Sequence, residues 1–251
     1  MKDTKAYLEK KAFFEKVLTI CGRNAVFEAL QDKDIDIYKL HLSSSNKKAK
    51  VLDDMISLAK QRDIAIVYHD KQALSRISKN SKQDQGVALD IVLQHFLNED
   101  EFLSQKQNYK ILALDGISNP QNLGMIIRSA TAGDIDAILL PSKGTSAITP
   151  LVIKASVGTI FRMPIIKTAN LKKTLLKFQE NKATLYTLSS YAPYSYKEEN
   201  YSDKTVFILG NETSGVSKDI ESLSDKSISI PMRREVESLN VAVTASLLAF
   251  M

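Results

Sequence analysis

The chain has 251 residues, of which one is cysteine and three are histidine, and it carries a formal net charge of +5. A single cysteine excludes an internal disulfide, and Cys21, His41, His69 and His95 lack the paired spacing of a structural zinc site. No apolar run is long enough to cross a bilayer, and the charged N-terminus does not resemble a secretory signal. We therefore expect a cytoplasmic protein of two domains, with no metal and no membrane partner.

The positive charge is spread along the chain, because residues 1–108 contribute +2 and the remainder contributes +3. Such a balance permits a polyanionic partner but does not by itself indicate one. The glycine-rich patterns of dinucleotide-binding and P-loop proteins are absent, as is the G-x-S-x-G pattern of serine hydrolases. These enzyme classes therefore have no support in the sequence.

The first ninety or so residues read as a small α/β unit with a helical N-terminal extension. In chain order, the residue spacing predicts helices over 5–18, 24–30, 47–60 and 71–78, and strands over 37–42, 64–68 and 86–92. Asn24 is a plausible N-cap of the second helix. The polar, acidic stretch 95–108 follows, and we expect it to be a linker between an N-terminal domain of residues 1–94 and a C-terminal domain of residues 109–251.

The second half alternates strands and helices, which indicates a parallel sheet covered by helices on both sides. The predicted strands are 110–114, 137–140, 185–189, 205–209 and 227–230, with an extended segment at 163–166, and the predicted helices are 122–132, 151–156, 171–181 and 240–251. In such sheets ligands bind outside the carboxyl ends of the strands. The fold class is therefore α/β, and the loops that follow these strands are the candidate functional segments.

Three of these loops carry distinctive residues. In the first, Asn122 can cap the following helix, and Arg128 lies about two turns further on, from where it could reach back toward the strand ends. The second places Glu212 in a glycine-rich turn directly after an apolar strand. In the third, Ser238 or Asn240 can cap the last helix. That helix is apolar nearly all round, so it is either core or a subunit interface, and we favour the interface.

Each loop alone has an ordinary structural explanation, but the three in this order closely resemble the signature motifs of the SpoU family of RNA ribose 2′-O-methyltransferases, within the SPOUT superfamily. The motifs read N-P-x-N-x-G-x-x-x-R over residues 119–128, G-x-E-x-x-G over 210–215 and I-P-M-x-x-x-x-x-S-L-N-V over 230–241. A K-A-S-x-G stretch at 154–158 is also similar to the family. More loosely, residues 21–92 resemble the small substrate-binding domain of its ribosomal-RNA members.

The resemblance implies S-adenosyl-L-methionine (AdoMet) as methyl donor, bound in a C-terminal trefoil knot, and a homodimer formed through the C-terminal domain. It implies an N-terminal RNA-binding domain with a ribosomal-protein-like fold. Carried over by position, the catalytic candidates are Asn122, Arg128, Glu212, Ser238 and Asn240. The cofactor-binding candidates are Leu209, Gly210, Gly215, Ile230, Met232, Ser238, Leu239 and Asn240. Candidate RNA contacts are Arg23, Lys47, Lys48 and Lys50.

The implied reaction is attack of a ribose 2′-oxygen on a sulfonium methyl group, which requires neither a metal nor a covalent nucleophile. Since a guanidinium is always protonated, we expect Arg128 to orient the hydroxyl and stabilise alkoxide charge rather than act as base. The most common acceptor in two-domain relatives is a guanosine of large-subunit rRNA. Two alternatives remain open, which are a tRNA acceptor and a non-catalytic RNA-binding protein on the same fold. The residues before Cys21 extend beyond the usual start of these enzymes.

Overall fold

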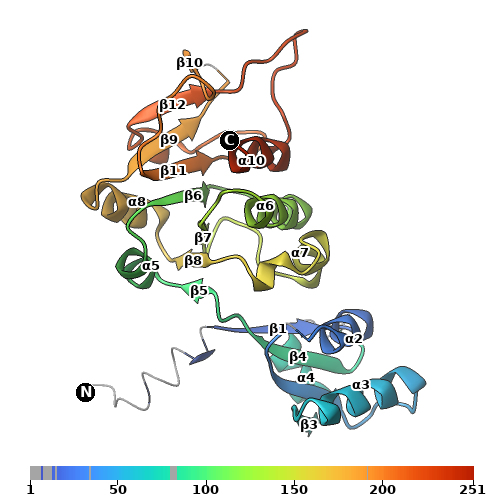
Figure 1. Cartoon of the computed structure of the whole chain (residues 1–251). Coiled ribbons are helices and arrows are strands. Elements are labelled where there is room, and N and C mark those ends of the chain that lie inside the picture. The colour runs from blue at the N-terminus through green and yellow to red at the C-terminus, as the bar shows by residue number, and fades with distance from the viewer. Residues whose placement is uncertain (1–6, 8–12, 15, 34, 80–83, 191) are drawn as a thin grey trace. The chain divides into compact units, whose positions relative to one another are not determined.

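The computed structural model describes residues 7, 13–14, 16–33, 35–79, 84–190 and 192–251. The chain divides into two compact units, Met1–Gln94 and His95–Met251, and each unit has its own β-sheet (Figure 1). Among the described residues no helix is long and apolar enough to cross a membrane. The fold class is α/β in both units, as the sequence predicts.

Unit 1 contains a four-stranded mixed sheet with the order β1-β4-β2-β3. Its elements are β1 (Val17–Cys21), α2 (Arg23–Gln31), β2 (Ile37–Ser43), α3 (Lys50–Gln61), β3 (Ala65–His69), α4 (Lys71–Ser78) and β4 (Val87–Val92). Strands β2 and β3 are parallel, whereas β4 runs antiparallel to both β1 and β2. The carboxyl ends of β1, β2 and β3 therefore lie at the same edge of this sheet as the start of β4.

Two predictions for unit 1 are wrong at its beginning. Most of the expected helix over 5–18 lies outside the described residues, but its last two residues, Val17 and Leu18, form the start of β1 and pair with β4. Val17 fits the helical spacing of apolar residues in the sequence, but its pairing with β4 outweighs this local preference, and the residue is part of a strand. Asn24 does not cap α2, since the helix begins at Arg23 and Gly22 occupies the cap position with φ of 93°.

Unit 2 contains an eight-stranded sheet with the order β10-β12-β9-β11-β6-β7-β8-β5, in which every pair of neighbours is parallel. Its strands are β5 (Phe96–Leu97), β6 (Tyr109–Leu114), β7 (Ala137–Pro141), β8 (Ile165–Thr168), β9 (Thr184–Leu188), β10 (Tyr194–Ser195), β11 (Lys204–Leu209) and β12 (Lys226–Ser229). Its helices are α5 (Glu99–Gln105), α6 (Pro120–Ala132), α7 (Pro150–Ala155), the 3₁₀ turn η1 (Thr159–Phe161), α8 (Leu171–Glu180), α9 (Lys218–Glu221) and α10 (Val241–Ala249). The parallel sheet expected for this half is confirmed, and its central strands β6, β7 and β11 are almost completely buried.

The stretch 95–108 is not a linker, because it is folded into unit 2. Strand β5 pairs with β8 at one margin of the sheet, and α5 begins with a capping box between Asn98 and Glu101. Phe102 of α5 is buried against Tyr109 and Phe178, with its ring centroid 5.4 Å from that of Tyr109. The polar composition of this stretch reflects an exposed helix face, whereas two buried phenylalanines anchor it to the core.

Helix α6 connects β6 to β7 and begins directly after the first motif loop. Its N-cap is Asn119, whose side chain accepts a hydrogen bond from Gln121 N at 2.8 Å, so the prediction of Asn122 as cap is wrong by one helical turn. Gly124 lets α7 approach closely, since a Cβ there would lie 2.7 Å from the carbonyl oxygen of Val152. Asn122 is consequently a buried residue inside the helix rather than a terminal one.

Helix α10 packs along α6, and the two are joined by a hydrogen bond between Ser129 Oγ and Ser246 Oγ at 2.7 Å. One face of α10 is buried in this contact, including Ala245 and Leu248. The opposite side leaves apolar side chains exposed, with Val243 at 42% and Phe250 at 64%. The helix is therefore half core and half uncovered surface within one chain.

The strand order brings the functional loops to one edge of the sheet. Strand β11 lies between β6 and β9, and β12 lies on the far side of β9. Because all four strands are parallel, the loops that follow β6, β9, β11 and β12 leave from the same edge. The trefoil knot that the family resemblance implies stays a prediction.

Candidate active site

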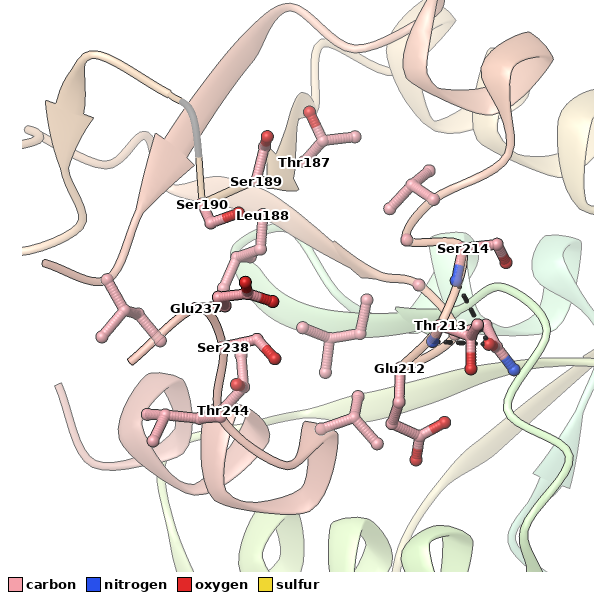
Figure 2. A pocket seen from close by; sticks show the side chains of 18 of the residues that line it. Thr187, Leu188, Ser189, Ser190, Glu212, Thr213, Ser214, Glu237, Ser238 and Thr244 are labelled. Atoms are coloured by element: carbon pink, nitrogen blue, oxygen red, sulfur yellow. Dashed lines mark hydrogen bonds between the residues drawn. The ribbon is translucent and has the colours of Figure 1, made fainter. Parts of the chain in front are cut away.

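A cavity of about 430 Å³ opens at the carboxyl ends of β9, β11 and β12. Figure 2 shows Glu212 and Ser214 on one side of it and Glu237 and Ser238 on the other, with Leu188 and Ser190, from the end of β9 and the residues after it, on the side of Glu237. Its apolar walls include the side chains of Leu209, Ile230, Met232, Leu239 and Val241. This size and this mixture of apolar walls with a few polar groups are typical of a small-molecule site.

The loop after β11 folds back on itself and forms one wall of the cavity. Asn211 and Gly215 exchange two backbone hydrogen bonds, of 3.0 and 2.8 Å. Gly210 has no space for a side chain, because a Cβ there would overlap the backbone of Gly215 and Val216. The residue at 210 must therefore be glycine for the turn to close this tightly.

The Asn211 side chain connects this loop to the loop after β6. Its Nδ2 donates to the carbonyl oxygen of Gly116 at 3.0 Å, and its Oδ1 accepts from the backbone N of Thr213 at 2.9 Å. Close by, Ser217 N donates to Asp115 Oδ2 at 2.8 Å. These bonds hold the turn that carries Glu212 in a fixed position relative to the start of α6.

Three of the predicted catalytic residues form one hydrogen-bonded cluster. Asn122 Nδ2 donates to Glu212 Oε1, and Asn122 Oδ1 accepts from Asn240 Nδ2 at 3.2 Å. Asn240 also caps α10, since its Oδ1 accepts from Ala242 N at 2.8 Å. The cluster thus joins the three motif loops through side chains that are up to 118 positions apart in the sequence.

The other two catalytic candidates lie differently. Ser238 lines the cavity two positions before Asn240, so it belongs to the same site (Figure 2). Arg128 is exposed on α6 and makes no hydrogen bond or ion pair with another described residue of its own chain. It lies six residues after Asn122, which turns it about 240° around the helix axis, so it shares no face with the buried amide.

The cavity includes every cofactor-binding candidate except Asn240, which flanks it: Leu209, Gly210, Gly215, Ile230, Met232, Ser238 and Leu239. Sequence reasoning missed the wall formed by the end of β9, with Thr187, Leu188 and Ser189, and it missed Asn211 and Thr244. The β9 residues carry no motif, and only the position of β9 between β11 and β12 makes them part of the site. Among the described residues no group of three or more potential ligands could hold a metal ion.

The RNA-binding candidates all lie in unit 1 at the edge where β1, β2 and β3 end. Lys47, Lys48 and Lys50 are exposed between β2 and the first residue of α3. Arg23, at the start of α2, is half-buried because its backbone N donates to Gln85 Oε1 and its Nε donates to the Gln85 carbonyl. The structure therefore gathers these four residues at one edge of a single sheet.

A parallel sheet with a polar cluster and a cavity at its carboxyl edge defines an α/β enzyme that binds a small molecule there. Residues 109–250 match the model of the SpoU rRNA Methylase family, and residues 19–96 match that of the RNA 2′-O ribose methyltransferase substrate-binding domain. The chain belongs to the SpoU family of RNA methyltransferases.

A relative of known sequence supports this assignment over nearly the whole chain, and two solved structures share its fold. A putative TrmH family tRNA/rRNA methyltransferase of Staphylococcus epidermidis is 32% identical, over 93% of this chain and 94% of its own length. The crystal structure of the SpoU methyltransferase AviRb from Streptomyces viridochromogenes, in complex with AdoMet, has a TM-score of 0.69 at 16% identity and covers 98% of this chain and 91% of its own. An AdoMet-bound rRNA methyltransferase from Sinorhizobium meliloti has a TM-score of 0.65 at 19% identity, with coverage of 98% and 88%.

Proposed function

We propose that this protein transfers the methyl group of AdoMet to a ribose 2′-hydroxyl in structured RNA. The observation that carries the proposal is the hydrogen-bonded cluster of Asn122, Glu212 and Asn240 beside a cavity formed by two of the same three motif loops. A cofactor site and a polar cluster next to one another are what a two-substrate transfer requires, because the acceptor has to be oriented against the donor.

The cavity fits AdoMet in chemistry as well as in size. Leu209, Ile230 and Leu239 provide apolar walls for an adenine ring, and the backbone of the loop at 210–215 offers polar groups for a ribose. Glu237 and Glu212 also line the cavity and complement a positively charged sulfonium. AdoMet would supply an electrophilic methyl group, so the protein has only to position the acceptor oxygen and accommodate its proton.

The cluster is built to position a hydroxyl rather than to form a covalent intermediate. Asn122 uses both ends of its amide, with Nδ2 on Glu212 and Oδ1 on Asn240, so its orientation is fixed. The second carboxylate oxygen of Glu212 can accept a hydrogen bond from the ribose. Ser238 adds a hydroxyl at the cavity wall. Preorganised groups of this kind contribute to catalysis by orientation and by stabilising developing charge.

We propose further that the enzyme is a homodimer and that Arg128 acts on the acceptor at the dimer interface. Met125 and Arg128 lie one turn apart on the exposed side of α6, with Met125 47% exposed. Val243 of α10, which packs on α6, and Phe250 directly after this helix are exposed too. Apolar surface of this kind around a charged residue is typical of a protein interface. Covering it with a second copy would bring each Arg128 toward a neighbouring site.

For the acceptor, we propose a guanosine of large-subunit rRNA, reached in the cytoplasm. The separate substrate-binding unit supports a large, structured RNA, since tRNA enzymes of the family often lack such a unit. A tRNA acceptor is the second candidate, because the similar Staphylococcus epidermidis protein is named a tRNA/rRNA methyltransferase. A non-catalytic RNA-binding protein is less well supported, since all five catalytic candidates are present.

Unit 1 has an asymmetric charge distribution that supports RNA binding at one edge of its sheet, which we call the basic edge. Arg23, Lys47, Lys48 and Lys50 lie there, at the carboxyl ends of β1 and β2. At the opposite edge, where β2 and β3 begin, Asp32, Asp36 and Asp63 lie in the connecting turns, and the Arg62 side chain donates to the carbonyls of residues 30, 32 and 35. Lys33 and Arg62 balance part of the negative charge of the second edge, so a polyanion is favoured at the first edge over the second.

The basic edge is tested by the salt dependence of RNA binding. In the double variant Lys47→Glu with Lys48→Glu, the fall of log K with log salt should become less steep, by about 0.9 in slope for each lost phosphate contact. Lys33→Glu, at the opposite edge, is the matched control and should leave the slope unchanged. Equal effects of both changes would contradict the assignment of the edge.

The function as a whole is tested by methylation of rRNA and tRNA from a strain that lacks the gene. The purified protein and labelled AdoMet are incubated with each RNA, and the modified nucleotide is mapped. Label on a 2′-oxygen of a large-subunit guanosine is the expected result. Label in tRNA would show that the acceptor is tRNA rather than rRNA. If calorimetric titration detects no binding of AdoMet, the non-catalytic alternative is favoured.

A further inference from the structure

Unit 1 contains a buried chain of titratable side chains that the methyl transfer does not use. His41 of β2 lies between Asp90 of β4 and His69 of β3, with its Nε2 3.0 Å from Asp90 Oδ2 and its Nδ1 2.9 Å from His69 Nε2. Thr19 of β1 donates from its hydroxyl to Asp90 Oδ1 at 2.6 Å. His41 and Asp90 are only 6% and 8% exposed. All four strands of the sheet thus contribute one member.

Hydrogen-bonding rules constrain the protons of this chain. Burial alone would raise the pKa of Asp90, but the hydrogen bonds from His41 and Thr19 outweigh it and lower that pKa, so the carboxylate is ionised at neutral pH. An ionised carboxylate only accepts, so His41 carries a hydrogen on Nε2. In neutral His41 the Nδ1 atom then accepts, and the hydrogen between the two rings belongs to His69 Nε2. The remaining nitrogen of His69, its Nδ1, makes no hydrogen bond with another described residue.

His69 is the surface end of the chain and lies at the basic edge. It is the last residue of β3, is half-buried, and pairs in register with Ser43 at the end of β2, just before the loop that carries Lys47 and Lys48. Its neighbour Tyr68, 59% exposed, points to the other face of the sheet, because successive side chains of a strand alternate.

The surroundings of His69 lower its pKa and so disfavour the imidazolium form in the absence of an anion. Desolvation by burial lowers its pKa most, and His41 and Lys39 lower it further, whereas Asp70 raises it. A phosphate close to Nδ1 would act in the opposite direction and favour the imidazolium form. Protonation at Nδ1 leaves the bond from His69 Nε2 to His41 intact, so the added charge disturbs no existing hydrogen bond.

We propose that His69 is a proton-linked contact for an RNA phosphate, held in position by His41 and Asp90. It takes up a proton from solvent at Nδ1 when RNA binds, and the hydrogen bonds through His41 to Asp90 orient the ring. The inference rests on the proposed binding of RNA by unit 1. It adds that this binding strengthens as the pH falls through the ordinary range of a histidine.

The test is the affinity of the full-length protein for its RNA as a function of salt, at about pH 5.5 and about pH 8. In the wild type the slope of log K against log salt should be steeper by about 0.9 at the lower pH, which corresponds to one additional phosphate contact. For His69→Gln, the slope of log K against log salt should be the same at both pH values. His95→Gln, at the exposed histidine outside unit 1, is the matched control and should behave as the wild type.

Asp90→Asn and the ring spectra separate the hydrogen-bonded chain from a simple surface histidine. The chain has three histidines, so ¹⁵N-labelled histidine spectra of the whole protein resolve each ring. Hydrogen on Nε2 of both His41 and His69 is expected, and Asp90→Asn should weaken the pH dependence while the protein stays folded. A wild type that binds RNA with one slope at all pH values would overturn this inference and leave the proposed function standing. No RNA binding at any pH would overturn both.

Discussion

Each unit holds a polar chain among buried strands or helices, and the two chains differ in the type of group that they use. In unit 2 the chain from Asn240 through Asn122 to Glu212 consists of two amides and one terminal carboxylate, and the amides do not titrate. In unit 1 the chain from Asp90 through His41 to His69 consists of groups that gain and lose protons. The first is suited to holding a fixed geometry over a wide pH range, and the second to responding to charge.

The largest effect is expected from a variant that disrupts the proposed chemistry of unit 2 but keeps the hydrogen bonds among Asn240, Asn122 and Glu212. Arg128→Lys keeps the positive charge but loses the planar fork that orients a hydroxyl and a phosphate together. We expect turnover to fall by about 100-fold or more, the range for loss of one preorganised donor, with unchanged AdoMet affinity. Single-turnover methylation and calorimetry measure the two quantities. Arg162→Lys, an exposed arginine after η1, is the control, and near-normal turnover of Arg128→Lys would exclude Arg128 from the chemistry.

A smaller effect is expected from the titratable chain of unit 1. Asp90→Asn removes the ionised acceptor of His41 and Thr19, and we expect it to destabilise unit 1 by about 1–3 kcal/mol at neutral pH. Because the folded pKa of Asp90 is lowered, its contribution is present above the unfolded value near 4 and is lost as the pH falls through the folded value. Denaturant unfolding of wild type and variant should therefore converge in acid. The exposed Asp63→Asn is the control, and a pH-independent difference would contradict the ionised form of Asp90.

The smallest effect is expected at the N-terminus of α10, where Asn240 is the cap. Asn240→Ala removes the cap of α10 together with the bond to Asn122, so it should cost about 1 kcal/mol of stability. In contrast to the Asp90 variant, this loss should not change with pH, since amides do not titrate. Thermal unfolding at two pH values distinguishes the two cases. A loss that follows pH would show that titration of Glu212, the carboxylate of this cluster, is coupled to the bonds of Asn240.

The three motif loops can be recognised as candidate functional segments from the sequence because each one carries its residues in fixed spacing after an apolar strand. Sequence reasoning could not identify Thr187 to Ser189, since their role depends on β9 lying between two strands that follow it in the chain. Arg128 was expected to reach back toward the strand ends, but the helical angle from Asn122 directs it to the surface. The start of β1 was assigned to a helix because its apolar residues match both periodicities, and only pairing with β4 decides between them.

The position of β5 has a practical consequence for dividing the protein. A catalytic fragment cut at Tyr109, where the methylase family match begins, would lose β5 and α5. Strand β8 would then present an unpaired edge, and Phe178 would lose the ring of Phe102 that covers it. Open edges and exposed aromatic surface promote aggregation. A fragment that starts at His95 keeps both elements and should not aggregate, although the polar sequence of residues 95–108 resembles a linker that could be removed.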